Sequence, residues 1–395
     1  MSPPEDPAPP VLTAPWLGAE ASRRVCETLA ATGHRVLYVG GCVRNALLGW
    51  PVHDIDLATD LDPAGVVALA EAAGIKAVPT GIAHGTVTLV ALGQPFEVTT
   101  FRRDVRTFGR QAEVAFSGDI AEDAARRDFT MNALYAEPDG RVVDPLGGLG
   151  DLRARRVRFV GDPGARIAED YLRILRFFRF HAWYGDAAAG LDAEGLAAAA
   201  ARQEGLEQIS RERVGAEMTR LLAAPDPAPA VAAMAATGIL ARILPGADAR
   251  GLAPLVHVEA LAGAAPRWPR RLALLGRQPE WDRGLRLPRA ESRALDAIAA
   301  ALEADEAPAQ GAFHHGPDAA RDAVLLRAAS LGTPPPPDLE AELARGAAAT
   351  FPLRAADLPL SGPALGAELA RLREAWIHAD FRLGAAELKA LPRAG

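Results

Sequence analysis

The spacing of apolar and polar residues changes near residue 150. Before that point, short runs rich in Val, Ile, Thr and Phe alternate with segments whose apolar residues stand three and four positions apart. The first pattern is typical of buried β-strands and the second of amphipathic helices. Strands are predicted at 36–39, 55–58, 75–78, 86–91 and 95–101, and helices at 16–32, 43–48 and 63–72. This alternation indicates an α/β fold.

After the stretch DPLGGLG at 144–150, the β-branched runs largely stop and the sequence becomes rich in Ala, Leu and Arg with helical spacing. We therefore predict an α/β head over 15–150 followed by an all-helical remainder, with the Gly-rich stretch as the joint. Residues 1–14, rich in Pro, Ala and acidic residues, are predicted to form a disordered tail.

One stretch of the head, residues 35–59, combines several chemical groups. A buried strand leads into a Gly-Gly pair that ends at Gly41 and turns the chain into a helix carrying Arg44. Asp54 and Asp56 follow on the next strand, where residues two apart point to the same face. Either feature alone is more often an ordinary turn or a solvated strand end. Together they favour a site for Mg²⁺ and a polyphosphate.

A third carboxylate is available on another predicted strand. Glu97 lies in the segment FEVTTF, and two interpretations are open for it: the third acid of a two-metal site, or an ordinary outward-facing strand residue. The dipeptide His53-Asp54 suggests a metal-dependent phosphohydrolase, but no other clustered histidines support that class, so we discard it.

Composition limits the classes of protein further. With 49% hydrophobic and 24% charged residues among 395, the chain has the composition of a soluble globular protein with large cores. The net charge of −7 argues against a broadly basic nucleic-acid coat. Between Arg153 and Arg179, however, eight arginines stand against three acids, which indicates a local phosphate-binding face.

The remaining compositional signals concern location. Cys26 and Cys42 are too few for a disulfide framework and indicate a reducing cytosol. The first residues lack the pattern of a signal peptide, and no apolar run is long enough to predict a membrane span.

The order of the motifs resembles a known family. VGGCVRNALLG, DIDLAT, FEVTTFR and RRDFTMNAL, followed by DPLGGLGDL and IAEDYLRILRFFRF, are similar to the motifs of the class II tRNA nucleotidyltransferase and poly(A) polymerase family, within the DNA polymerase β superfamily. The resemblance covers residues 35–220. It implies a mixed-sheet nucleotidyltransferase head, a helical neck at 151–250 with a template for the nucleotide base, and a helical body and tail at 251–395 that bind tRNA.

The same resemblance implies roles for individual residues in the head. Asp54 and Asp56 would be the ligands of Mg²⁺ and, with Glu97, the catalytic carboxylates. Gly41 and Arg44 would contact the triphosphate of the incoming nucleotide.

Later in the head, Arg127 would contact the sugar or a phosphate of the nucleotide, and Asp128 would support the site. Two positions depart from the family. Asn45 stands where most relatives have Asp, so a structural role is predicted for it rather than metal binding. Phe108 stands where relatives often carry Asp, in a segment at 102–119 that resembles the flexible loop used to switch from C to A addition.

Asp170 and Arg173 have a physical argument of their own. Three positions apart on a helix, they can present one edge to a base. The carboxylate would accept from N4 of cytosine or N6 of adenine, while the arginine donates to the adjacent ring nitrogen. Uracil and guanine carry the opposite pattern, and a mismatched bidentate pair costs about 1–3 kcal/mol. The alternative is a surface ion pair, but the motifs upstream favour the base template.

The rest of this segment is assigned by the resemblance. Arg176 and Arg179 would be further nucleotide contacts, whereas Phe177, Phe178 and Phe180 are expected to pack in the core. Asp144 with the glycines after it resembles the family's hinge, which is compatible with an ordinary interdomain turn.

The complete sequence predicts a template-independent enzyme that adds C, C and A to the 3′ end of tRNA from CTP and ATP, releasing pyrophosphate. We expect Mg²⁺ as cofactor, a cytoplasmic location, and neither a membrane nor a protein partner. A poly(A) polymerase is disfavoured because the C-terminal region is not a long basic extension, and a CC-adding enzyme because 102–119 is present; an A-adding enzyme is a further alternative.

Two alternatives come from other classes. A non-catalytic tRNA-binding protein is disfavoured by the intact pair Asp54 and Asp56. A transferase acting on a small molecule is disfavoured by the large helical region.

Overall fold

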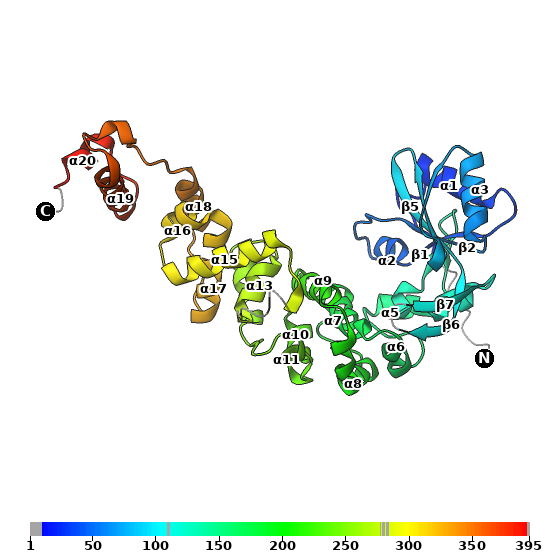
Figure 1. Ribbon diagram of the computed structural model, residues 1–395. Helices are drawn as coiled ribbons and strands as arrows, with labels where there is room; N and C mark the ends of the chain where they lie inside the picture. The colour runs from blue at the N-terminus through cyan, green and yellow to red at the C-terminus, as the bar shows by residue number, and fades with distance from the viewer. Residues whose placement is uncertain (1–9, 109–110, 277, 279–280, 282–283, 393–395) are drawn as a thin grey trace. The chain divides into compact units, whose positions relative to one another are not determined.

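The computed structural model of the chain describes residues 10–108, 111–276, 278, 281 and 284–392, with the backbone alone at 80, 83, 104–108 and 111–114 (Figure 1). The chain forms two compact units. Unit 1 comprises the residues up to Glu217 together with Thr237–Ile239, and unit 2 comprises Met218–Ala236 and the residues from Leu240 onward.

Unit 1 contains the mixed sheet that the sequence predicts. Its strands are β1 (Val36–Val39), β2 (Asp56–Thr59), β3 (Lys76–Gly81), β4 (Thr86–Ala91), β5 (Gln94–Thr100), β8 (Tyr135–Ala136) and β9 (Val142–Val143). They form one sheet in the order β3-β4-β5-β2-β1-β8-β9. Only the pair β2 and β5 is parallel among these strands, so the sheet is mixed.

The central strands owe their position to burial. All four residues of β1 are buried, and β4 alternates half-buried and buried residues as its apolar spacing predicts. The helices α1 (Glu20–Ala30) and α3 (Pro63–Ala72) contact each other and β4 (Figure 1). The carboxylate of Asp62 accepts a hydrogen bond of 2.7 Å from the N–H of Gly65 and so fixes the start of α3.

A separate two-stranded hairpin lies between β5 and β8 in the chain. β6 (Arg102–Phe108) pairs with β7 (Gln111–Phe116), and both lie in the segment that resembles the family's flexible loop. The side chain of Phe108, one of the two departures from the family, lies outside the described part of the chain.

Besides α1 and α3, unit 1 contains α2 (Gly41–Leu47), which follows β1, and several helices after the hairpin. The later helices are α4 (Ile120–Ala125), α5 (Gly148–Arg153), α6 (Pro163–Glu169), α7 (Leu172–Tyr184), α8 (Ala193–Ala201) and the start of α9 (Arg211–Leu222). Phe177, Phe178 and Phe180 of α7 are buried. Their rings pack near those of Phe129 and Phe159, with centroids 4.9 Å apart for Phe129–Phe180 and 5.5 Å for Phe159–Phe177. The prediction that these residues pack in the core is confirmed.

The Gly-rich joint is a tightly packed turn inside unit 1. The carboxylate of Asp144 accepts hydrogen bonds from the N–H groups of Gly148 (2.8 Å) and Leu149 (2.9 Å), which caps α5. A Cβ at Gly148 would collide with the carbonyl of Thr130, so only glycine fits there. The two compact units divide near Glu217, and this joint lies within unit 1.

From α5 onward, the described part of the chain contains helices and no further strands. The predicted all-helical remainder is therefore confirmed. The later helices are α10 (Ala228–Ala236), α11 (Ile239–Ile243), α12 (Leu252–Leu261), α13 (Trp268–Leu274), α15 (Arg289–Ala304), α16 (Pro308–His315), α17 (Pro317–Leu331), α18 (Leu339–Ala348), α19 (Gly362–His378) and α20 (Ala385–Ala390). Within the described ranges, none of the helices has the length and apolar character needed to cross a bilayer.

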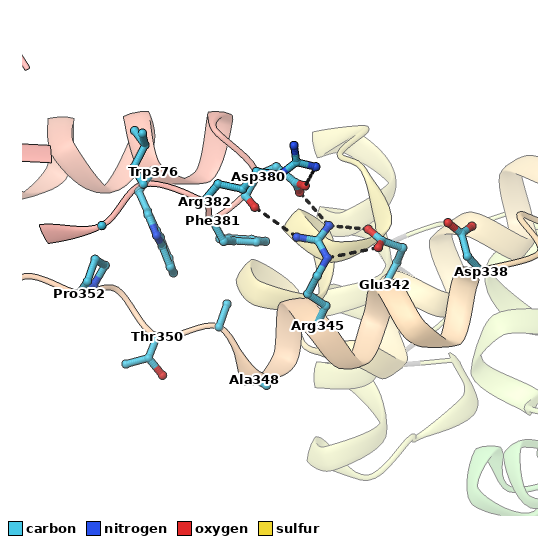
Figure 2. A pocket seen from close by; sticks show the side chains of 13 residues that line it. Asp338, Glu342, Arg345, Ala348, Thr350, Pro352, Trp376, Asp380, Phe381 and Arg382 are labelled. Carbon is cyan, nitrogen blue, oxygen red and sulfur yellow. Dashed lines mark hydrogen bonds and ion pairs between the residues drawn. The ribbon is translucent and has the colours of Figure 1, made fainter. Parts of the chain in front are cut away.

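An open hollow of about 890 Å³ lies in unit 2, beside the end of α18 (Figure 2). Figure 2 shows Arg345 between two acids, and its guanidinium donates to Glu342 at 2.5 Å and to Asp380 at 2.7 Å. Asp380 and Phe381 have φ angles of 57° and 62° and turn the chain after α19. These ion pairs join α18 to that turn, so the charges beside the hollow serve the fold.

Candidate active site

The turn between β1 and α2 requires glycine. Gly40 has φ 70° and ψ −119°, a conformation that other residues rarely adopt, and a Cβ there would lie 3.3 Å from Nη1 of Arg127. Gly41 then begins α2. Because the first N–H groups of a helix have no intrahelical partner, Gly41 stands where an anion can be bound.

The candidate carboxylates meet at the parallel strand pair. Asp56 is the first residue of β2, and Glu97 of β5 is its direct neighbour in the register. The prediction that Asp54 also lies on the strand is wrong. The β1–β2 ladder starts at Tyr38 and Leu57, and β1 ends at the glycine turn, so Asp54 lies in the loop before β2, with an exposed side chain.

These acids influence one another electrostatically. Burial, together with the negative charges of Glu97 and Asp54, raises the pKa of Asp56 from 3.8 to about 6, against the opposing charge of Arg127. In this conformation the three acids do not form a cluster with ligand atoms within 4.8 Å of one another. Carboxylate oxygens are the ligands that Mg²⁺ prefers, and a cation would relieve the repulsion at Asp56, so this donor set fits a divalent metal.

Arg44, on α2, is a buried cation with neutral partners. It donates to Asn132 Oδ1 at 2.5 Å, to Asn45 Oδ1 at 2.8 Å and to the hydroxyl of Tyr184 at 2.7 Å. Burial lowers the pKa of Arg44. Since a buried charge is costly unless it is paired, an anion bound here would stabilise it. Asn45 also donates to the carbonyl of Pro51 at 3.0 Å, which fits the structural role expected for it.

Arg127 is held rigidly beside the glycine turn. Its guanidinium donates to Asp123 at 3.0 Å and to the hydroxyl of Tyr135 at 3.1 Å, and that hydroxyl donates to Asp123 at 2.7 Å. Arg127 is therefore fixed next to Gly40, and its charge also acts on Asp56. It links the glycine turn to the carboxylates.

Asp128 connects α7 to the segment that carries Arg127. It accepts hydrogen bonds from Arg176 (2.6 Å), from the amide of Asn132 (2.9 Å) and from the N–H of Phe129 (2.8 Å). Although burial opposes it, the charge of Arg176 and these hydrogen bonds hold the pKa of Asp128 well below its usual range. Because Asn132 also bonds Arg44, this network connects the two arginines.

Arg176 and Arg179 share a second acid. Glu217 of α9 accepts from Nε of Arg179 at 2.5 Å and lies 3.8 Å from Nη1 of Arg176. The guanidinium of Arg179 also lies over the ring of Phe180, 4.6 Å from its centroid. Both predicted nucleotide contacts are thus oriented by protein groups.

The single helix expected through Asp170 and Arg173 is not present. α6 ends at Glu169, Asp170 is extended with φ −152°, and α7 starts at Leu172. Asp170 forms a two-bonded ion pair with Arg213 (2.6 and 3.2 Å), while Arg173 pairs with Glu169 at 2.5 Å. Two interactions hold Asp170 outside the helix: the ion pair with Arg213, and a hydrogen bond of 3.2 Å that its carboxylate accepts from the N–H of Leu172 at the start of α7. A cavity of about 290 Å³ adjoins Asp170 and Arg213.

The local excess of arginines is also smaller than the sequence indicates. Acids from outside the 153–179 segment pair with several of them: Asp151 with Arg156 (2.5 Å) and Arg158 (2.8 Å), besides Asp128 and Glu217 above. Counting arginines and acids within residues 153–179 alone could not include these acidic partners from elsewhere in the chain.

Several residues at the site were not predicted from the sequence, among them Tyr184, Arg213 and Glu217. Tyr184 is 140 residues from Arg44, and no local sequence pattern predicts that contact. Arg213 and Glu217 stand four apart on α9, a spacing that places both on one helix face, and this was the available signal.

Two segments of the chain match known protein families. Residues 36–158 match the family described as "Poly A polymerase head domain", and residues 191–250 match "Probable RNA and SrmB- binding site of polymerase A". The mitochondrial CCA tRNA nucleotidyltransferase 1 of Mus musculus is 41% identical over 207 residues, 52% of this chain and 48% of that protein. The chain thus matches about half the length of several curated relatives.

Two further relatives match over a longer range. The CCA-adding enzyme of Geobacillus stearothermophilus is 35% identical over 325 residues, 79% of this chain and 78% of that protein. A crystal structure of the Bacillus stearothermophilus CCA-adding enzyme in complex with CTP has a TM-score of 0.74 and 31% identity, covering 93% of this chain and 94% of that one. The resemblance inferred from the motifs is confirmed, and this chain belongs to the class II tRNA nucleotidyltransferase and poly(A) polymerase family.

Proposed function

We propose that this protein adds C, C and A to the 3′ end of tRNA, using CTP and ATP and releasing pyrophosphate. One observation carries the proposal: Arg127 lies against the glycine turn while its charge acts on Asp56. Groups suited to a triphosphate and groups suited to a metal therefore belong to one site.

In the proposed reaction, the 3′ hydroxyl of tRNA attacks the α-phosphate of the nucleotide in line, and pyrophosphate leaves. Asp54 and Asp56, with Glu97 beside them, would hold Mg²⁺, which lowers the pKa of the attacking hydroxyl and stabilises the leaving group. Gly41 would donate its N–H and Arg44 its guanidinium to the triphosphate.

The nucleotide would be oriented by the arginines behind the glycine turn. Arg127 is fixed by Asp123, so it can contact the sugar or a phosphate without ordering its own side chain. Arg176 and Arg179 would contribute positive charge beside the base, each oriented by an acid.

Base selection is assigned to Asp170 and Arg173. Asp170 accepts from the exocyclic amine of cytosine or adenine, and Arg173 donates to the adjacent ring nitrogen. Each of these two side chains is oriented by an ion pair before the nucleotide binds. Asp170 is held by Arg213, and Arg173 is held by Glu169. Uracil and guanine would meet mismatched groups, at a cost of about 1–3 kcal/mol.

The larger assignments follow from the family. We assign catalysis to the head (15–150), base selection to the neck (151–250) and tRNA binding to the body and tail (251–395). A cytoplasmic location is proposed from the two buried free cysteines, Cys26 and Cys42, which fit a reducing compartment.

The experiment that tests this proposal uses tRNA transcripts ending before CCA, after C and after CC. Each is incubated with Mg²⁺ and one labelled nucleotide, and then with all four. Two additions of C and one of A, after which addition stops, is the expected result. Unlimited addition of A would identify a poly(A) polymerase, and arrest after CC or addition of A alone would identify a partial enzyme. No incorporation with intact tRNA binding would leave a non-catalytic tRNA-binding protein.

A further inference from the structure

Unit 2 contains a cluster of metal-ligating side chains far along the chain from the catalytic carboxylates. Glu306, His314 and His315 each offer one ligand atom, and these atoms lie within 4.8 Å of one another. Across the described residues this is the only group of three or more His, Cys, Asp or Glu side chains that meets this distance. The proposed reaction makes no use of it.

Local backbone structure brings the three residues together. Asp305, in the left-handed conformation with φ 48°, ends α15 and turns the chain, and Pro308 then starts α16. The two histidines are the last residues of α16, and helical side chains lean toward the start of their helix. Glu306 consequently reaches both: Oε1 lies 2.6 Å from Nδ1 of His314, and Oε2 lies 3.6 Å from Nε2 of His315.

One carboxylate oxygen of this cluster makes no hydrogen bond. Oε2 of Glu306 is buried and accepts no hydrogen bond among the described residues. A buried carboxylate oxygen without a partner costs free energy, and native structures rarely leave one unless an ion or a water satisfies it. The oxygen lies on the side of His315, so a ligand between these two groups would satisfy it.

The surroundings hold the cluster in place. Arg327 of α17 donates to the carbonyl of Ala301 at 2.7 Å and pairs with Asp305 at 3.1 Å, which fixes the turn before Glu306. The ring of Phe313 lies 5.4 Å from that of His314. The three side chains are 20–26% exposed, so water can complete a coordination shell.

We propose that Glu306, His314 and His315 bind a divalent transition-metal ion of the Zn²⁺ class. Two imidazole nitrogens and one carboxylate oxygen are a ligand set that Zn²⁺, Co²⁺ and Ni²⁺ prefer, whereas Mg²⁺ and Ca²⁺ prefer oxygen alone. Bound there, the ion joins the segment before α16 to the end of that helix and stabilises unit 2.

The test measures metal content and affinity in the full-length chain, in an Asp54→Asn/Asp56→Asn background that removes the candidate metal ligands of the head. Zn²⁺ is titrated calorimetrically, and Co²⁺ binding is followed by visible absorption. We expect one site that is lost in His315→Gln and weakened at least about tenfold in Glu306→Gln. His257→Gln, an exposed histidine of α12, is the matched control and should retain the site.

Two outcomes would overturn the proposal. If Zn²⁺ does not bind at micromolar concentration, the cluster is only a set of contacts between one carboxylate and two imidazoles. If Zn²⁺ binds equally well to the parent and to both His314→Gln and His315→Gln, the ion occupies another place. Neither result depends on nucleotide addition, so the proposed function is tested separately.

Discussion

At the scale of single residues, Arg44 combines burial with positive charge, and its described hydrogen bonds go to neutral groups. We expect Arg44→Gln to lower kcat/KM for both CTP and ATP by about 10–100-fold, because hydrogen bonds to charged groups contribute about 1.5–3 kcal/mol. Steady-state kinetics with tRNA lacking its end measure this. Arg141→Gln, which removes an exposed ion pair with Asp139, is the control. Unchanged kinetics in Arg44→Gln would remove Arg44 from the triphosphate site.

Asp56 is a residue where function opposes stability. Its pKa of about 6 lies above the ordinary 3.8. Between these values the folded protein binds more protons than the unfolded chain, so the free energy of unfolding falls as pH rises from about 4 to 6. Without added metal at pH 7.5, Asp56→Asn should therefore melt at a higher temperature than the parent, by an amount equivalent to at most about 3 kcal/mol.

The Asp56→Asn variant also tests how metal affects stability. Mg²⁺ should raise the melting temperature of the parent at pH 7.5 and have little effect on Asp56→Asn, which should also be inactive. Thermal denaturation at pH 5 and pH 7.5, with Mg²⁺ or with EDTA, measures both effects. An Asp56→Asn protein less stable than the parent at pH 7.5 would contradict this account of the carboxylate cluster.

At the scale of elements, the break between α6 and α7 depends on Arg213 of α9, which holds both oxygens of Asp170. Arg213→Met should leave Asp170 less well oriented and reduce the preference for CTP over UTP by about tenfold, within the range for one bidentate pair. Misincorporation of UTP into tRNA lacking its end measures this preference. Arg211→Met, at an exposed neighbouring position, is the control. An equal loss for all nucleotides would indicate a purely structural role.

Elements whose ends are set by local chemistry could be predicted from the sequence. α3 has the predicted bounds because Asp62 caps it and Pro63 starts it, and β4 has the predicted bounds because its burial alternates. The helix break at Asp170 has one local signal, because its carboxylate accepts from the N–H of Leu172 as a helix-capping Asp does. Its ion pair with Arg213, 43 residues away, could not be predicted from the sequence.

The candidate site shows the same limit. The motifs predicted charged residues such as Arg44 and Arg127 for it, but not Arg213 or Glu217. The register of β2 and β5 then placed Glu97 beside Asp56, which periodicity alone left open. What could not be predicted is how those residues are paired. The contact of Arg44 with Tyr184 and the ion pairs of Asp128 and Glu217 are tertiary, and no local pattern encodes them.

At the scale of the whole molecule, each compact unit has a core of its own. The core of unit 2 surrounds a buried ion network in which Glu259 of α12 accepts from Arg270 and Arg271 of α13, each at 2.7 Å. Asp322 of α17 pairs with Arg270 at 2.9 Å, and all four side chains are nearly inaccessible to solvent. The network thus joins three helices of one unit, so its loss should lower the stability of that unit.

Glu259→Gln should therefore distinguish the contributions of the two units. Removing one partner of a buried ion pair costs about 3–5 kcal/mol, so a melting transition of unit 2 should move to lower temperature. CTP binding by unit 1, measured calorimetrically below that transition, should be unchanged, while affinity for tRNA should fall if unit 2 binds it. Glu340→Gln breaks an exposed pair with Arg321 and should cost at most about 1 kcal/mol. If CTP affinity fell together with the stability of unit 2, the assignment of nucleotide binding to unit 1 alone would be wrong, because the site would then require the helical unit to be folded.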